Sequence, residues 1–257
     1  FVVLHGVPGS RLITRGFPVR DDMRFIVPER PGFGASSFHP KRTHLDYAKD
    51  IEQLLDHLEI EKCIMVGISG GGPYALTCAW AMPDRVKAVG LVSSGTLQLQ
   101  NFASKTKRIL LHFNRGFCRP SELALKGLGA WAVRYPEQAS KLLTRFYASA
   151  DQEMLVRDDV RQLLVANTKE ALAQGSRGLA HELRMYMEPW PFDLAEVGQP
   201  VYMWHGEEDT EAPVAVVEHL QDSLKNCRAI TVPGAGHLWM VDHAEEMLEI
   251  LIPAFRE

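Results

Sequence analysis

Short apolar runs alternate with amphipathic stretches along most of the chain. Each run is followed by a turn rich in glycine, proline or polar residues, a pattern typical of buried strands. The expected strands cover residues 1–4, 24–27, 63–66, 86–92, 202–205 and 229–232. Residues 44–58 place their apolar side chains on one helical face and follow Thr43, a good helix cap. The alternation predicts an α/β fold, with a mostly parallel sheet and helices on both of its faces.

The pattern changes between about residues 96 and 197, where no clear strand is found. Helical periodicity, interrupted by Pro120, Pro136 and Gly175, predicts several helices in this stretch. They are expected at residues 102–117, 121–135, 136–148, 151–173 and 175–187. The chain therefore divides into a first core segment (1–95), a helical insertion (96–197) and a second core segment (198–257). The insertion comes before the last two strands.

The segment Gly67-Ile68-Ser69-Gly70-Gly71 lies where an apolar strand turns into a helix. This is the context of the G-x-S-x-G nucleophile elbow, in which the serine has a strained backbone. Such a turn leaves no room for side chains at the flanking positions, where Gly67 and Gly71 fit. The helix that follows offers unpaired N–H groups to a developing negative charge. The alternative is a glycine-rich turn with an incidental serine.

A serine hydroxyl needs a histidine base, and the histidine needs a carboxylate that fixes its tautomer. On a parallel sheet that carries such an elbow, the three residues follow in the order Ser, Asp or Glu, His. Asp209 and His237 each come directly after an expected strand, as Ser69 does. The three loops should therefore meet at one edge of the parallel sheet. We predict a catalytic set of Ser69, Asp209 and His237.

Each partner has competitors nearby. Glu207 or Glu208 could replace Asp209 as the orienting acid. His243 is close to His237, but it falls in the stretch expected to form the last helix. His5 precedes a glycine and is expected to bind the backbone of its own loop.

Acyl transfer also needs N–H donors for the oxyanion. One should be the backbone N–H of Gly70, the residue after the nucleophile. The second should come from the loop after the first strand, where Val7 follows His5-Gly6. Pro8 has no N–H and cannot serve.

Charge is distributed unevenly along the chain. The 257 residues are 46% hydrophobic and carry a formal net charge of −4, which gives no general case for nucleic acid binding. Residues 101–150 hold nine Lys or Arg against two Glu, a net charge of +7 that leaves −11 on the remainder. We interpret this basic stretch as a solvated helix face. Contact with an anionic membrane surface is the alternative.

The four cysteines are Cys63, Cys78, Cys118 and Cys227, and they form no C-x-x-C pair. Cys63 and Cys78 lie in apolar runs, which favours buried thiols, a reducing compartment and a cytoplasmic location. No apolar run is long enough to span a membrane, and no signal peptide is visible. The chain begins at Phe1 rather than at methionine, so the absence of a leader carries little weight.

Five pieces of the chain carry a family resemblance. In chain order they are His5-Gly6-Val7-Pro8-Gly9, residues 30–36, residues 67–73, residues 205–209 and Gly236-His237. Together they resemble the α/β-hydrolase superfamily, in its capped, serine-nucleophile, esterase-like branch. The resemblance implies that the insertion is a helical cap and that residues 30–36 are mainly structural.

Two features qualify the resemblance. The family usually has two further strands before the His5-Gly6 loop, so either upstream sequence is missing or the sheet is short. A short sheet would leave residues 24–27 near an exposed edge. The nucleophile is Ser69 and not an aspartate, which argues against a haloalkane dehalogenase or an epoxide hydrolase.

The expected activity is hydrolysis of a small carboxylic ester through an acyl-enzyme on Ser69, with no metal or organic cofactor. Amide, lactone, thioester or carbon–carbon bond hydrolysis would use the same residues. A peptidase of the proline iminopeptidase kind would need acidic cap residues, for which Glu182 and Glu188 are available. A receptor-like or non-catalytic member of the fold is a further alternative. The sequence does not indicate an oligomeric state.

Aromatic and sulfur-containing residues of the insertion are the candidates to line an apolar substrate pocket. They are Phe113, Phe117, Trp131, Phe146, Tyr147, Met185, Met187 and Trp190. The alternative for each residue is a place in the insertion's own core.

Overall fold

A computed structural model describes residues 1–98, 101–102, 118–135, 138, 142 and 148–256. Its centre is a five-stranded parallel sheet in which the strands lie side by side in chain order. The strands are β1 (Val2–Leu4), β2 (Cys63–Ile68), β3 (Val86–Val92), β4 (Val201–Gly206) and β5 (Cys227–Val232). The predicted α/β fold with a parallel sheet is confirmed.

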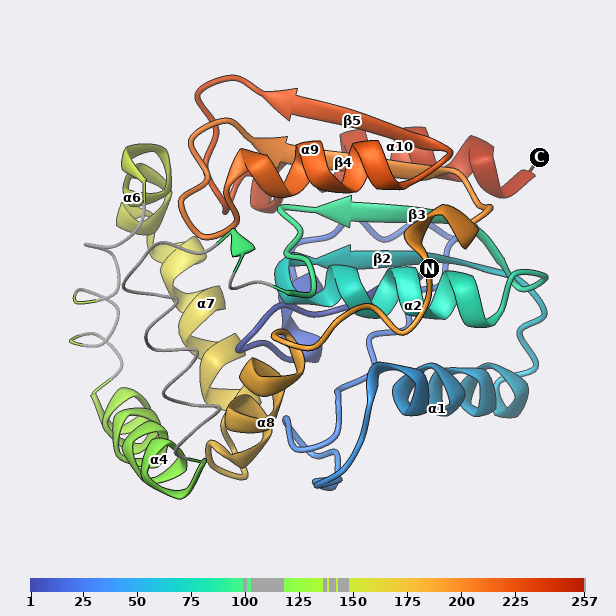
Figure 1. The fold of residues 1–257 in the computed structure, drawn as a ribbon. Coiled ribbons are helices and arrows are strands. Elements are labelled where there is room, and N and C mark those ends of the chain that lie inside the picture. The colour runs from blue at the N-terminus through green and yellow to red at the C-terminus, as the bar shows by residue number, and fades with distance from the viewer. Residues whose placement is uncertain (99–100, 103–117, 136–137, 139–141, 143–147, 257) are drawn as a thin grey trace.

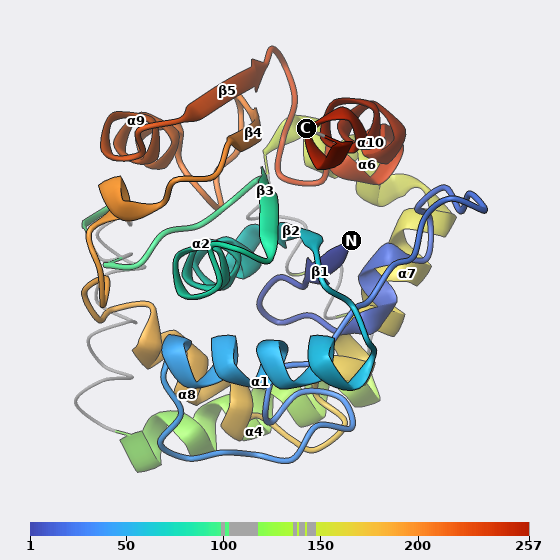
Figure 2. The same ribbon diagram turned by 90° about the vertical axis from the view of Figure 1, so that its right-hand side faces the viewer.

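Helices cover both faces of the sheet (Figure 2). One face carries α1 (His44–His57), α2 (Gly72–Ala81) and α9 (Val214–Ser223), and the other carries α10 (Met240–Arg256). Successive residues of a strand point to opposite faces. Met65 of β2 accordingly joins the core under α1, α2 and α9, whereas Ile64 and Val66 join the core under α10.

Helix α1 begins as the sequence predicts. The Thr43 hydroxyl accepts a hydrogen bond from the Asp46 N–H (3.2 Å), and the Asp46 carboxylate accepts one from the Thr43 N–H (3.0 Å). This reciprocal capping box satisfies two backbone donors at the helix start.

The expected strand at residues 24–27 forms only an isolated bridge. The Val3 N–H donates to the Ile26 carbonyl oxygen, and the Ile26 N–H donates to the Phe1 carbonyl oxygen, both at 2.8 Å. A full strand does not form because β1 offers only three residues for pairing, and Pro28 has no N–H to extend the ladder. Residues 24–27 lie beside β1, at the edge where a short sheet was expected to leave them.

The insertion between β3 and β4 is helical where it is described. Its helices are α4 (Cys118–Arg134), α6 (Ser149–Val156), α7 (Asp158–Ala171) and α8 (Arg177–Met185). The single helix predicted over 151–173 is two helices, because Arg157 between them has an extended backbone (φ −68°, ψ 129°). The helices predicted at 102–117 and 136–148 lie mostly outside the described residues.

Figure 1 shows the insertion helices beyond the carboxyl ends of the strands, at the tips of the arrows. Parallel α/β sheets place their functional loops at this edge. The insertion therefore faces the loops that carry Ser69, Asp209 and His237.

Cys63 and Cys78 are buried free thiols, as expected, and Cys227 is a half-buried free thiol. The side chain of Cys118 lies outside the described residues. Among the helices that are described, none has the length and apolarity needed to cross a bilayer.

Candidate active site

Ser69 lies at the sharp turn between β2 and α2. Its φ of +51° is in the left-handed region, which costs a non-glycine residue about 1–3 kcal/mol. The neighbouring positions leave no space for side chains. A Cβ on Gly67 would lie 2.6 Å from the Gly72 Cα, and a Cβ on Gly71 would overlap the Leu4 carbonyl oxygen. The turn therefore has the tight geometry that the G-x-S-x-G pattern predicts.

Three loops bring Ser69, His237 and Asp209 together. Ser69 follows β2, Asp209 follows β4 and His237 follows β5. His237 Nε2 is 3.0 Å from Ser69 Oγ, and His237 Nδ1 is 2.7 Å from Asp209 Oδ2. The result is a continuous hydrogen-bonded chain from the carboxylate through the imidazole to the hydroxyl.

The Asp209 carboxylate is completely buried. Its Oδ1 accepts hydrogen bonds from the N–H groups of Glu211 (2.8 Å) and Ala212 (2.9 Å). Burial raises the pKa of Asp209, but the charge and hydrogen bond of His237 and the Ala212 N–H lower it more, so the net pKa lies below its ordinary value. Asp209 is therefore ionised at neutral pH.

His205 also lies near this carboxylate. Its Nε2 is 3.6 Å from Asp209 Oδ2, too far for a hydrogen bond, and 2.6 Å from the Ala212 carbonyl oxygen. Burial lowers the pKa of His205 more than Asp209 raises it. His205 is therefore neutral at neutral pH, and His237 is the imidazole that contacts the acid.

Burial by itself lowers the pKa of His237. The charge and hydrogen bond of Asp209 raise it more, and Glu211 and Asp151 add to the increase, so the net pKa lies above its ordinary value. The His237 side chain is 12% exposed. The Ser93 hydroxyl donates to the His237 carbonyl oxygen at 2.9 Å. A held imidazole with a raised pKa is suited to accept a proton from Ser69.

The competing acids do not contact His237. Glu207 and Glu208 are exposed, and Glu208 instead accepts a hydrogen bond from the Ser149 hydroxyl (3.2 Å). The geometry therefore favours Asp209 over both glutamates.

The competing histidines are held elsewhere. His243 lies in α10, where it contacts Glu246 (2.7 Å) and stacks on Trp239. His5 is fully buried, and its Nε2 accepts a hydrogen bond from the Arg30 N–H (3.3 Å). Its Nδ1 lies 2.9 Å from the Gly6 carbonyl oxygen, so His5 also binds the backbone of its own loop, as the sequence suggested.

The expected oxyanion donors belong to two adjacent loops. A Cβ on Gly6 would lie 3.3 Å from the Ser69 Cβ, and a Cβ on Gly70 would lie 2.7 Å from the Val7 Cγ2. The loop after β1 therefore packs directly against the elbow. Val7 and Gly70 are neighbours beside Ser69.

Tyr186 of the insertion reaches the same point. Its hydroxyl donates a hydrogen bond to the Gly70 carbonyl oxygen and lies 3.1 Å from Glu182 Oε1. Both side chains are buried. The peptide that follows Ser69 is thereby attached to the segment after α8.

Glu182 is the anionic centre of a buried cluster. Its Oε1 pairs with Arg30 Nε (2.8 Å), and its Oε2 pairs with Arg42. Arg30 also donates to the carbonyl oxygens of His5 (2.6 Å) and Gly6 (2.8 Å). Burial raises the pKa of Glu182, but the two arginines lower it to about 2. Glu182 already holds two arginines, so it does not serve as the substrate-amine ligand that the iminopeptidase alternative needs.

The substrate-binding candidates differ in how deeply they are buried, and some lie outside the described residues. Met185 is buried against Arg42 and Tyr74, and Met187 is also buried. Trp190 is half-buried and packs on Phe192 with 5.4 Å between ring centroids. Trp131 of α4 is 36% exposed. Phe113, Phe117, Phe146 and Tyr147 lie outside the described residues. Substrate contact stays a prediction for the whole set.

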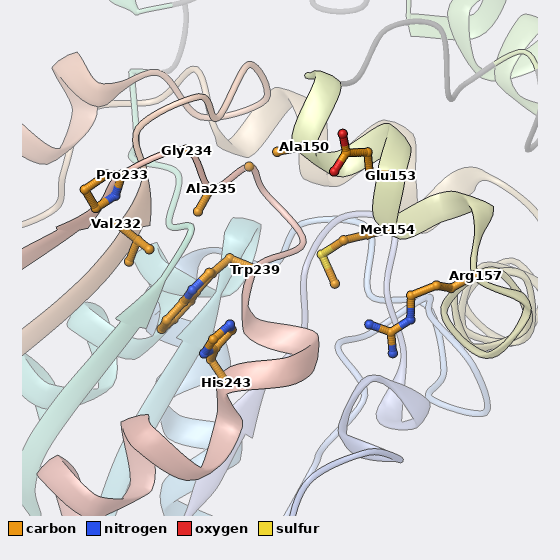
Figure 3. Close-up of a pocket in the computed structure, with 11 residues that line it drawn as sticks. Ala150, Glu153, Met154, Arg157, Val232, Pro233, Gly234, Ala235, Trp239 and His243 are labelled. Carbon is orange, nitrogen blue, oxygen red and sulfur yellow. The ribbon is translucent and has the colours of Figure 1, made fainter.

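A groove of 480 Å³ opens beside the loop that carries His237 (Figure 3). Met154 of α6 and Arg157, which follows α6, line one side, and Trp239 and His243 lie across from them. Ser69, Asp209 and His237 are not among its lining residues. Across the described part of the chain, no three His, Cys, Asp or Glu side chains gather into a metal site.

The sequence did not predict that Asp151 and Tyr186 contact the loops of the candidate site. Asp151 accepts hydrogen bonds from the backbone N–H groups of His237 and Leu238, more than 80 positions away. No motif marks either residue. Their partners are backbone groups of distant loops, and only the folded chain brings them together.

Comparison with known proteins identifies the family. A sequence profile described as alpha/beta hydrolase fold matches residues 1–244. The chain belongs to this family, and the resemblance seen in the sequence is confirmed.

Individual relatives are more distant. The chain is 24% identical over 259 residues to the dihydrolipoyllysine-residue acetyltransferase component of an acetoin cleaving system from Pseudomonas putida, a match covering 100% of this chain and 63% of that protein. It is 33% identical over 150 residues to a proline iminopeptidase from Neisseria gonorrhoeae, covering 55% of this chain and 41% of that protein. In both cases the match spans less than two thirds of the relative.

A thermophilic esterase from Thermogutta terrifontis is similar in structure. The TM-score is 0.69 at 21% sequence identity, with 99% of this chain and 89% of the esterase covered. At this identity the likeness shows a shared fold.

Proposed function

We propose that the chain is a serine hydrolase that cleaves carboxylic esters of small molecules through an acyl-enzyme. The observation that carries the proposal is the hydrogen-bonded chain from Asp209 through His237 to Ser69. Membership of the α/β-hydrolase family supports it. So does the likeness to an esterase, at the level of the fold.

In the first half of the reaction, Ser69 Oγ attacks the carbonyl carbon of the ester while His237 Nε2 takes the hydroxyl proton. The imidazolium is stabilised by the ionised Asp209, which accepts the Nδ1–H and keeps the ring in this tautomer. The bond to the alkoxy oxygen then breaks, and His237 gives its proton to the leaving alcohol. An acyl group remains on Ser69.

In the second half, His237 Nε2 takes a proton from water as the water oxygen attacks the acyl carbon. The bond to Ser69 Oγ breaks, the proton returns to Ser69, and the acid is released. The backbone N–H groups of Gly70 and Val7 hold the negative oxygen in both halves. Such donors are worth about 3–4 kcal/mol each in other hydrolases.

We also propose that residues 96–197 act as a cap that selects the substrate. The position of the insertion helices beyond the carboxyl ends of the strands supports this role (Figure 1). Residues 1–95 and 198–257 would then form the catalytic core. The apolar candidates of the cap favour an acyl or aromatic group over a charged one.

Labelling with a fluorophosphonate probe tests the nucleophile. We expect covalent labelling of the wild type, no labelling of Ser69→Ala, and normal labelling of Ser37→Ala, which removes an exposed serine. Absence of labelling in a folded wild-type protein would overturn the proposal.

A substrate panel tests the type of bond. It contains p-nitrophenyl esters of rising acyl length, a lactone, an acyl p-nitroanilide and proline p-nitroanilide. The proposal expects repeated turnover of esters and weak activity on the proline substrate, because Arg30 and Arg42 already bind Glu182. One fast turnover followed by retention of the product would instead indicate a receptor-like protein.

A further inference from the structure

Asp151 is a completely buried acid in the first turn of α6. Both of its oxygens are used by the loop that follows β5. Oδ2 accepts a hydrogen bond from the His237 N–H (2.8 Å), and Oδ1 accepts one from the Leu238 N–H (2.7 Å). The insertion therefore holds the backbone of the same residue whose ring contacts Ser69 and Asp209.

The loop is shaped to receive this carboxylate. A Cβ on Gly236 would overlap the Asp151 carboxyl group, so only glycine allows the acid to lie so close. From the core side, the Ser93 hydroxyl donates to the His237 carbonyl oxygen (2.9 Å). The backbone of His237 is thus fixed at its N–H by the insertion and at its carbonyl by the segment after β3.

The Asp151 carboxylate does not cap the start of its own helix, α6. The residue before α6, Ala148, has no side chain that could cap the helix, and Asp151 directs both oxygens to the distant loop. Burying a carboxylate is costly unless its oxygens are hydrogen-bonded. Here the N–H groups of His237 and Leu238 supply the hydrogen bonds that the buried Asp151 carboxylate needs, and the carboxylate supplies their acceptors.

We propose that Asp151 is a positioning residue for the base: it holds His237 in register with Ser69 and Asp209, so that hydrolysis requires α6 to be seated on the histidine loop. This inference rests on the proposed function. It deepens that function by making the insertion a part of the reaction centre as well as a selector of substrate.

The charge of Asp151 should also affect the pKa of His237, which can be measured separately from the rate. The titratable groups that face His237 are Asp209 and Glu211 from the loop after β4, Asp151 from α6, and the neutral His205. The three carboxylates raise the pKa of His237. Burial raises the pKa of Asp151 itself, although the Leu238 and His237 N–H groups partly offset this. Removal of the Asp151 charge should therefore lower the pKa of His237.

The experiment compares Asp151→Asn and Asp151→Ala with the wild type on the best p-nitrophenyl ester. Asparagine offers one acceptor for two N–H groups, and alanine offers none. We expect kcat to fall by about tenfold or more in both variants, with KM changing far less, since a displaced reacting group can cost up to about a hundredfold. The acidic limb of the kcat/KM profile should move to lower pH. The matched control is Glu153→Gln, which neutralises an exposed acid two residues further along α6 and should change neither quantity.

Chemical rescue gives a second readout. Ala150, the neighbour of Asp151 in the chain, and Gly236, whose Cβ position lies against the Asp151 carboxyl group, both line the groove, so formate can reach the space left in Asp151→Ala. We expect sodium formate, but not sodium chloride, to restore part of kcat in this variant.

The outcomes separate the two proposals. Wild-type labelling at Ser69 tests the hydrolase itself. With that in place, wild-type kcat and an unmoved pH profile in folded Asp151→Asn would overturn the positioning role. If both Asp151 variants fail to fold, as judged by circular dichroism, Asp151 acts on folding alone and the inference is equally overturned.

Discussion

The Tyr186 hydroxyl donates a hydrogen bond to the carbonyl oxygen of Gly70, the residue directly after Ser69. A side chain of the insertion thereby fixes the peptide next to Ser69. The same hydroxyl lies against Glu182, which holds Arg30 and Arg42 in the buried cluster. The hydroxyl of Tyr186 therefore joins the buried cluster to the turn that carries Ser69.

Tyr186→Phe should weaken both properties. Loss of the hydroxyl leaves the buried Gly70 carbonyl without this donor, which costs about 1–3 kcal/mol of unfolding free energy. We expect kcat to fall about threefold to tenfold with little change in KM, because the elbow loses one support. Urea unfolding and ester kinetics measure the two effects. Tyr135→Phe, at an exposed tyrosine, is the control, and equal losses in the two variants would contradict the interpretation.

Asp209→Asn should leave the fold largely intact and disable the base. An amide can present its NH₂ group to His237 and favour the wrong tautomer of the imidazole, which lowers kcat by about 10³-fold or more. Ester turnover measures the loss, and a thermal melt checks the fold. Glu207→Gln, at the exposed acid that the sequence also offered, should retain wild-type kcat. A greater loss in Glu207→Gln would reassign the orienting acid.

The pH profile should reflect the raised pKa of His237. The base must be neutral to accept the Ser69 proton, and its pKa in the folded protein lies above the ordinary value of about 6.5. The kcat/KM value should therefore be high in mild alkali and fall as pH decreases through a midpoint above about 6.5. Glu211→Gln removes one of the charges responsible, so its midpoint should shift to lower pH. An acidic limb centred below pH 6 in the wild type would contradict this assignment.

Glu182→Gln should destabilise the protein strongly. It leaves two buried arginines without their anion, a change that costs about 3–5 kcal/mol in comparable buried pairs. The pKa of Glu182 is lowered to about 2 in the folded state, so its contribution is present above about pH 4.5 and is lost as pH falls toward 2. The gap in urea midpoint between wild type and variant should narrow from pH 7 to pH 3. Glu218→Gln, at an exposed acid of α9, should match the wild type at both pH values.

Much of the fold follows from local pattern. Apolar runs and the Thr43 cap predict the sheet and α1, because burial and capping act over a few residues. The G-x-S-x-G spacing predicts the elbow for the same reason. Strand order then predicts that the loops of Asp209 and His237 meet Ser69, and the structure brings their side chains into contact. The catalytic role of the three residues stays a prediction.

Other features depend on contacts that sequence spacing does not encode. Residues 24–27 look like a strand, but their pairing is limited by the three residues of β1. The break at Arg157 lies in a continuous helical pattern, and the guanidinium there pairs with Asp159 and with Asp242 of α10. From the sequence, Glu182 is available to bind a substrate amine. In the structure, two arginines more than 130 positions away bind it instead. In each case tertiary partners override the local signal.

If residues 96–197 are the cap proposed above, their exchange between relatives is a route to a new substrate preference. In this protein Asp151, Glu182 and Tyr186 all belong to that segment. They hold the histidine loop, the arginine pair and the peptide after Ser69. A chimera that lacks them would begin with a damaged reaction centre, whatever pocket it gained. Redesign should therefore carry these three side chains over unchanged and vary the positions between them.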